Sequence, residues 1–154
     1  DTQLNISRAY LKPGFAFGGS CLPKDLRATM YLAKQKDVEL PMHAGILSSN
    51  RVHLEHAIAK VLASGKRRVG LIGLAFKSGT DDLRESPMVY LAEHLIGKGL
   101  SLLVYDPEVH LSSLIGANRR FIDTHVPHLG GLIRSDLAEV VAGADVLVLG
   151  LGDA

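Results

Sequence analysis

The chain has 154 residues, and 47% of them are hydrophobic, which suffices for a packed core in one domain or in a small domain plus part of another. Lysine and arginine number 17 against 16 aspartate and glutamate residues, so the composition lacks the basic footprint of a nucleic-acid-binding protein. The single cysteine excludes an internal disulfide and suits a reducing, cytoplasmic setting, and no run of about 18 apolar residues indicates a membrane span.

The residues before the first predicted helix carry the cysteine. They show no sustained periodicity and are rich in turn formers, which predicts an extended loop leading to Cys21. Gly14, Gly18 and Gly19 tolerate positive φ and allow a backbone or a ligand to approach closely. A thiol just before a helix N-terminus, with Lys24 following, has two reasons to ionise more easily than a free thiol. The pattern therefore favours a nucleophile, whereas composition alone favours a small buried apolar residue.

Two helices are predicted in the first half of the chain. Pro23 suits a first helical position, and apolar residues spaced by three or four predict a helix that runs to about Lys36. Pro41 opens a second helix, which Ser64 and Gly65 end, so the best domain boundary separates residues 1–65 from 66–154. The second helix carries an apolar stripe with heptad spacing and one charged position, made of Ala44, Leu47, Arg51, Leu54, Ile58 and Val61. Taken alone, such a stripe favours packing on the preceding helix.

From Arg67 the pattern changes to apolar runs that alternate with helical segments, which predicts an α/β unit with a parallel sheet. The predicted strands are 69–74, 100–105 and 146–149. Ser86 and the proline after it begin a helix that Gly99 can end. Asp136 begins another helix, where Glu139 is placed to complete a capping box. The stretch between the second and third strands is the least regular and predicts one or two short helices with loops.

The sequence predicts no dinucleotide fingerprint in the α/β half and no metal site in the chain. Gly70 and Gly73 superficially resemble the G-x-G-x-x-G fingerprint, but their spacing is wrong for it. A strand followed by a loop and a helix N-terminus still makes a ready anion site. His53 and His56 lie three residues apart on a helix without a third ligand, and no H-E-x-x-H or Cys-His cluster occurs.

Two long segments resemble motifs of one enzyme family. GFAFGGSCLPKD at residues 14–25 resembles the active-site motif of the nucleotide-sugar dehydrogenases that oxidise UDP-glucose or GDP-mannose to the uronic acid, and GLAFKSGTDDLRESP at 73–87 resembles a second motif of that family. Phe-Ala-Phe before the glycine pair, LPKD after the cysteine and LNIS at residues 4–7 look most like the members that act on GDP-mannose, with UDP-glucose as the alternative substrate.

The resemblance implies a central helical, dimerisation region followed by a Rossmann-like parallel-sheet domain that binds the nucleotide sugar. It also implies a homodimer or higher homo-oligomer and an NAD-binding domain upstream, so we expect this chain to be a fragment that is also incomplete at its C-terminus. Exopolysaccharide precursors such as those for alginate are the products that the resemblance suggests. A rival hypothesis is that this chain alone is a binding and dimerisation module without turnover.

The catalytic roles follow from the resemblance. It implies an NAD-dependent four-electron oxidation in which Cys21 forms a thiohemiacetal and then a thioester. Asp25 is implied as the group that orients or activates water, and it shares a helix face with Cys21 if the helix starts at the thiol. A first-turn carboxylate favoured by the helix dipole is the alternative for Asp25. Lys24 and Arg84 are implied as cofactor contacts.

The substrate contacts also follow from the resemblance. Tyr10, Lys12, Phe15 and Gly18 match the substrate-binding loop of the family, and Lys77 matches the lysine that reaches the substrate. The chain departs from the pattern at residue 12, where arginine is expected, and at residue 9, where alanine replaces an aromatic residue. The charge pattern alone favours a different interpretation, a local ion-pair network within the second motif. Its members would be Lys77, Asp81, Asp82, Arg84 and Glu85.

Overall fold

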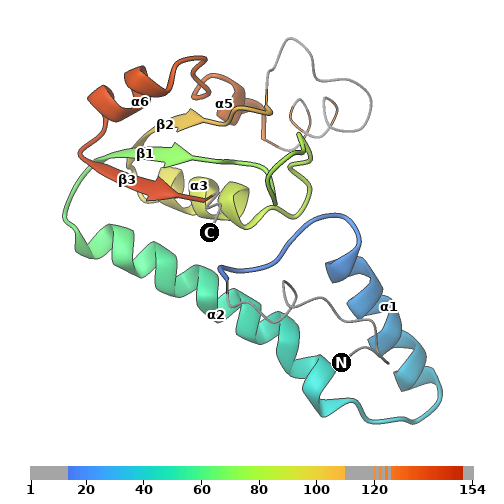
Figure 1. Cartoon of the computed structure of the whole chain (residues 1–154). Coiled ribbons are helices and arrows are strands. Elements are labelled where there is room, and N and C mark those ends of the chain that lie inside the picture. The colour runs from blue at the N-terminus through green and yellow to red at the C-terminus, as the bar shows by residue number, and fades with distance from the viewer. Residues whose placement is uncertain (1–13, 110–119, 121, 123, 125, 151–154) are drawn as a thin grey trace, which may run out of the picture.

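The structure is a computed structural model that describes residues 14–109, 120, 122, 124 and 126–150. Two helices, α1 (Leu22–Gln35) and α2 (Pro41–Ala63), form an arm beside a parallel sheet (Figure 1). The sheet has the order β2–β1–β3 and consists of β1 (Arg68–Ile72), β2 (Ser101–Tyr105) and β3 (Val146–Leu149). The remaining described helices are α3 (Pro87–Gly97), α5 (Pro127–Gly130) and α6 (Leu137–Gly143). The predicted fold class, a helical region followed by a parallel α/β sheet, is confirmed.

The helix starts follow from local chemistry. α1 begins directly after Cys21 with Pro23 in its first turn, and α2 begins at Pro41, where a missing backbone N–H costs the helix nothing. α3 is capped by Ser86, whose Oγ accepts a hydrogen bond from the backbone N–H of Met88 at 3.1 Å. The predicted boundaries of α1, α2, α3 and the three strands agree with these elements to within two residues.

One predicted cap is corrected by the structure. Asp136 caps α6 as expected, because its carboxylate accepts from the N–H of Ala138 at 2.8 Å. Glu139, however, bonds to the guanidinium of Arg134 at 2.8 Å and not to the helix start as a capping box requires. Both partners in the Glu139–Arg134 bond are charged, whereas a backbone amide is neutral, which favours the arginine as partner. The irregular stretch was predicted to hold one or two short helices, and its described residues include the short helix α5 and helical residues at 120, 122 and 124.

The apolar stripe of α2 divides into two parts. Its second half, Leu54, Ile58 and Val61, is buried, and the last two of these residues belong to the core between α2, α3 and the sheet. Arg51, the one charged residue of the stripe, is exposed. The expectation that the stripe packs on the preceding helix is therefore wrong for its buried half, which contacts α3. α2 thus fixes the position of the helical arm relative to the sheet.

α3 and α6 cover opposite faces of the sheet (Figure 1). Val69, Leu71, Leu102 and Val104 point toward α3 and are almost fully buried, with exposures of 1%, 0%, 4% and 0%. On the other face Gly70 leaves room for α6, since a Cβ atom there would lie 2.9 Å from Val140. Because all three strands run parallel, the loops that leave their carboxyl ends meet at one edge. Residues 73–86, the second motif, leave β1 at that edge.

Candidate active site around Cys21

Cys21 stands at the N-cap position of α1 and is exposed to solvent. Its side chain makes no capping hydrogen bond, and its Sγ lies 3.8 Å from Oγ of Ser20. Its carbonyl accepts the first helical bond, from the N–H of Asp25 at 2.8 Å. The thiol is therefore accessible and held at the start of a helix, and it is not the buried apolar residue that composition favoured.

The loop before Cys21 packs directly on the second motif. Gly18 is buried, and a Cβ atom at this position would lie 2.1 Å from the carbonyl oxygen of Glu85 and 2.7 Å from Cδ of Pro87. Gly19 has φ +87°, and a Cβ atom there would lie 2.7 Å from the ring of Phe76. Any residue larger than glycine at these positions would force the loop before Cys21 away from the second motif. The glycine pair is thus needed for contact between two parts of the chain that are far apart in sequence.

The same loop is tied to α2 by Asn50. Its side-chain amide accepts from the N–H of Phe17 and donates to the carbonyl of Phe17, each at 2.9 Å. This paired contact satisfies both backbone polar groups of Phe17. Sequence analysis did not identify Asn50, although a partly buried polar residue spaced by three or four from Leu47 and Leu54 was a signal for such a role.

The two charged residues after Cys21 pair with each other. The Nζ atom of Lys24 lies 3.3 Å from Oδ1 of Asp25, and about two thirds of each side chain is exposed, 66% and 65%. Exposed pairs of this kind are weak, so either side chain can exchange its partner for a bound ligand at little cost. Both groups lie in the first turn of α1, next to the thiol.

Arg84 lies within electrostatic reach of Cys21. Its guanidinium binds Asp82 through Nε and Nη2, both at 2.8 Å, and this hydrogen bonding raises the pKa of Arg84, to which the charge of Cys21 adds. The same contact lowers the pKa of the Asp82 carboxyl. The expected local ion-pair network thus includes an Asp82–Arg84 pair.

The predicted substrate contacts are brought together only in part. Lys77 is exposed with its Nζ 5.4 Å from the centre of the Phe76 ring, the ring that packs on Gly19. Phe15 lies along α2 beside His53, in two pockets of about 410 and 520 Å³. Tyr10 and Lys12 lie outside the described residues.

A buried carboxylate that the sequence did not single out supports the second motif. Asp106 follows β2, is 2% exposed, and accepts from the N–H groups of Leu74 and Ala75 through Oδ2 at 2.6 and 2.9 Å. Its other oxygen accepts from the N–H of Glu108 at 2.9 Å. A polar residue directly after a buried parallel strand was the available signal, since such residues lie at the carboxyl edge of the sheet.

The residues present fit the phosphate part of a dinucleotide but not its Rossmann turn. Lys24 and Arg84 are the cations that could hold phosphates, whereas Gly70 serves the packing of Val140, Ala144 and Leu147. Within the described ranges, no three His, Cys, Asp or Glu side chains gather where they could hold a metal ion. In the same part of the chain, no helix combines the length and apolar character needed to cross a membrane.

Two family models match the chain. Residues 70–153 match the UDP binding domain of the UDP-glucose/GDP-mannose dehydrogenase family, and residues 1–52 match the central domain of that family. The GDP-mannose 6-dehydrogenase of Pseudomonas aeruginosa is 54% identical over 153 residues, which are 99% of this chain and 35% of that protein. The UDP-glucose 6-dehydrogenase of Bacillus subtilis is 36% identical over 106 residues, 66% of this chain and 23% of that protein.

Solved structures agree with these matches. A crystal structure of a ternary complex of GDP-mannose dehydrogenase from Pseudomonas aeruginosa superposes with a TM-score of 0.91 at 54% identity, covering 99% of this chain and 35% of that one. A UDP-glucose dehydrogenase from the archaeon Pyrobaculum islandicum superposes with a TM-score of 0.79 at 27% identity, covering 97% and 33% of the two chains. The chain therefore spans about a third of the length of the relatives that it matches.

Proposed function

Because the chain belongs to the UDP-glucose/GDP-mannose dehydrogenase family, as its motifs predicted, we propose that its full-length protein oxidises the primary alcohol of GDP-mannose to the carboxylate, giving GDP-mannuronate. The observation that carries the proposal is an exposed Cys21 at a helix start, preceded by two glycines that pack against the loop carrying Lys77 and Arg84. The higher identity to a GDP-mannose enzyme, 54% against 36% for a UDP-glucose enzyme, supports GDP-mannose as the substrate.

Cys21 is the proposed nucleophile for the second half of this four-electron oxidation. After the alcohol has become an aldehyde, the thiolate adds to the carbonyl carbon and forms a thiohemiacetal. Loss of a hydride from that carbon and of the proton from its hydroxyl gives a thioester, and attack by water releases the acid and restores the thiolate. NAD, when bound, supplies the hydride acceptor for both oxidations. The exposure of Cys21 and the lack of a capping bond to its side chain leave the sulfur available for this role.

The neighbouring charges support the remaining steps. We assign to Asp25 the orientation of the water that hydrolyses the thioester, since its exposed carboxylate lies one helical turn from the thiol. Lys24 and Arg84 would hold the phosphates of NAD, and their positive charges also favour the thiolate. Lys77, Phe15 and Gly18 are the proposed substrate contacts among the described residues, and Tyr10 and Lys12 remain predictions.

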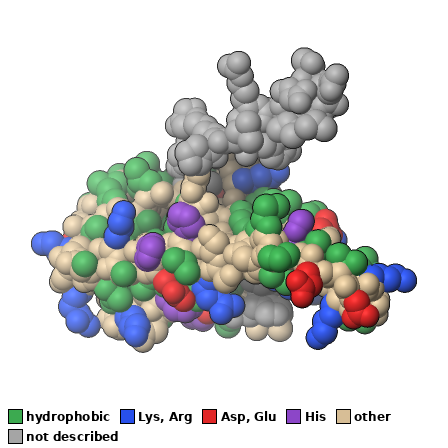
Figure 2. Space-filling model, turned by 90° about the horizontal axis from the view of Figure 1, so that it is seen from below, with side chains coloured by type: hydrophobic (Ala, Val, Ile, Leu, Met, Phe, Trp, Pro, Cys, Tyr) green, Lys and Arg blue, Asp and Glu red, His purple; other side chains and the backbone are tan. Residues whose placement is uncertain are grey.

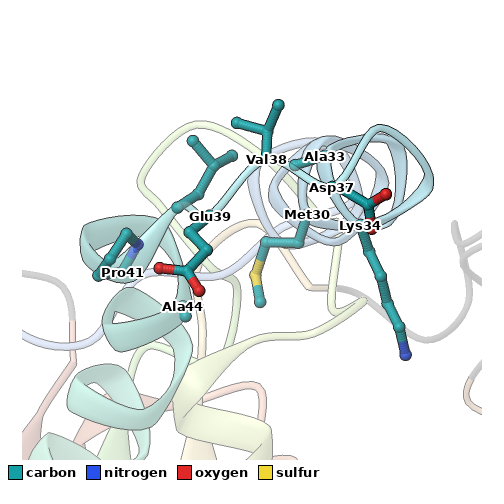
Figure 3. Close-up of a pocket in the computed structure, with 9 residues that line it drawn as sticks. Met30, Ala33, Lys34, Asp37, Val38, Glu39, Pro41 and Ala44 are labelled. Atoms are coloured by element: carbon teal, nitrogen blue, oxygen red, sulfur yellow. The ribbon is translucent and has the colours of Figure 1, made fainter.

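We further propose a homodimer that uses the face of α1 and α2. Tyr31, Leu32, Val38 and Met42 are apolar yet expose 63%, 58%, 52% and 75% of their surface, and hydrophobic side chains are spread over this face (Figure 2). A pocket of about 570 Å³ opens between the two helices, with Met30 pointing into it (Figure 3). In light scattering, Met42→Glu should shift the full-length protein toward the monomer, and an unchanged mass would contradict this dimer.

The division of the chain at residue 65 and the cytoplasmic setting also remain proposals. The central-domain model ends at residue 52 and the model of the UDP binding domain begins at residue 70, so the boundary lies between the two, which supports the division.

The function is tested with the full-length protein, NAD and either GDP-mannose or UDP-glucose. Two NADH should form per uronate, with a higher kcat/KM for GDP-mannose, and Cys21→Ser should abolish uronate formation. Unchanged uronate formation by Cys21→Ser would reject the role of the thiol, and preference for UDP-glucose would establish the alternative substrate. NADH formation by residues 1–154 alone would reject the rival hypothesis that this chain is a binding module without turnover.

A further inference from the structure

An ion pair joins the helix that follows Cys21 to the loop that presents Arg84. Nη1 of Arg27 donates to Oε2 of Glu85 at 3.3 Å, and Nη2 binds the other carboxylate oxygen. The two residues are 58 positions apart in sequence. Arg27 lies on α1, and Glu85 directly follows Arg84, so the pair connects the two segments that form the candidate site.

Glu85 also contacts the thiol loop through its backbone. Its carbonyl oxygen lies so close to Gly18 that a Cβ atom at residue 18 would be 2.1 Å away. Its φ is +52°, a conformation that bulky residues seldom adopt. Among the described non-glycine residues Asp37 shares a positive φ, but it lies in the turn after α1, where such a conformation is common. Strain of this kind persists where surrounding contacts hold it in place, and at Glu85 those contacts lead to the thiol.

The two arginines of the site bind different carboxylates. Arg84 pairs with Asp82, while the adjacent Glu85 is held by Arg27. Without Arg27, the Glu85 carboxylate would be a free anion beside Arg84 and near the thiol. It would compete with Asp82 for the guanidinium and would oppose negative charge on Cys21.

We propose that Arg27 and Glu85 are positioning residues that set the place of Cys21 relative to Arg84, a role that rests on the function proposed above. Neither residue needs to touch the substrate. The pair is half exposed, 51% and 47%, so it contributes little to stability. The rate depends on it more strongly, because a displacement of about 1 Å in an active site can lower a rate by about 100-fold. The distinguishing result is thus a loss of kcat without a comparable loss of stability or substrate binding.

The test uses the full-length protein with Arg27→Ala, Glu85→Ala and both together. Each single change should lower kcat for NADH formation with GDP-mannose by at least about tenfold, with KM within about twofold, and the double change should be no worse than either single one. Arg27→Lys should recover part of the rate. The matched control is Arg68→Ala, which removes a similar two-pronged pair with Asp145 at the amino end of β1, far from the site, and should leave kcat unchanged.

A second readout needs no substrate. Alkylation of Cys21 by iodoacetamide at pH 7 should slow by about threefold or more in Arg27→Ala, and the change should be smaller when Glu85→Ala is added. Additive losses in kcat, or an equal loss in Arg68→Ala, would overturn the positioning role. If the wild-type protein oxidises no nucleotide sugar, the proposed function fails, and equal alkylation rates in wild type and Arg27→Ala would then separately reject this inference.

Discussion

A single added methyl group at Gly18 tests whether contact between the two motifs is needed for activity. In Gly18→Ala the new Cβ would lie 2.1 Å from the carbonyl oxygen of Glu85, whereas carbon–oxygen contacts are ordinarily about 3.3 Å or longer. The shortfall exceeds about 1 Å. Rotation of a side chain cannot relieve it, because the nearest atoms belong to the backbone of Glu85 and to the ring of Pro87 at the start of α3.

The added group should therefore push the thiol loop away from the second motif. Overpacking of this kind costs about 1–3 kcal/mol in the free energy of unfolding. A displacement of about 1 Å at the thiol should lower kcat by about 100-fold. Urea unfolding of the full-length protein and the initial rate of NADH formation measure the two effects separately.

Gly45→Ala is the matched control, because nothing lies within 4 Å of a Cβ atom at this position on α2. It should raise the free energy of unfolding by about 0.5–1 kcal/mol, since alanine favours a helix interior, and leave kcat unchanged. A Gly18→Ala protein with wild-type kcat and wild-type stability would refute the idea that the two motifs must touch.

Three further changes test the supports of the site. Asn50→Ala removes both hydrogen bonds to Phe17, so the free energy of unfolding should fall by about 1–3 kcal/mol in urea, and Ser49→Ala, which keeps both bonds, should have little effect. Asp106→Ala leaves buried amides without an acceptor and should cost about 3 kcal/mol or more, a loss that an unchanged urea midpoint would contradict. The folded-state pKa of Asp82 is lowered, so its bond to Arg84 stabilises the fold above the unfolded value of about 3.9 and is lost as pH falls through the folded pKa. The stability difference between wild type and Asp82→Asn should thus be largest near neutral pH and should shrink below about pH 4. Urea unfolding of both proteins near neutral pH and again below about pH 4 measures this difference.

The boundaries of the helices and strands could be predicted from the sequence, because residues adjacent in sequence set where these elements begin and end. Pro23, Pro41 and Ser86 mark helix starts by their own chemistry, and the alternation of apolar runs with helical segments predicted a parallel sheet. The stripe on α2 indicated which face is buried, but a stripe carries no information about its partner. The buried half, ending at Ile58 and Val61, consequently met α3 and not the helix before it.

The site was predictable to the extent that single positions carry chemistry. An exposed thiol before a helix follows from the Pro-Lys-Asp sequence after Cys21 and from the glycines before it. The contacts that hold the thiol in place do not, because Arg27 and Glu85 are ordinary surface residues whose pairing appears only when the chain has folded. The spacing of Asn50 from Leu47 and Leu54 indicated a partly buried position, but it did not indicate the partner, Phe17, which lies 33 positions away.

Cys21 lies at a junction between the two segments that carry the two motifs of the proposed site. The thiol lies on the helical arm, while Arg84 and Lys77 lie on a loop that leaves the carboxyl edge of the sheet (Figure 1). The sheet and Asp106 fix that loop from one side, and α2 carries the arm through its buried contacts with α3. Neither unit alone sets the distance between thiol and arginine. That distance depends on the contacts of Gly18 and Gly19 with the second motif. A substitution at either glycine should therefore lower kcat while each unit keeps its fold.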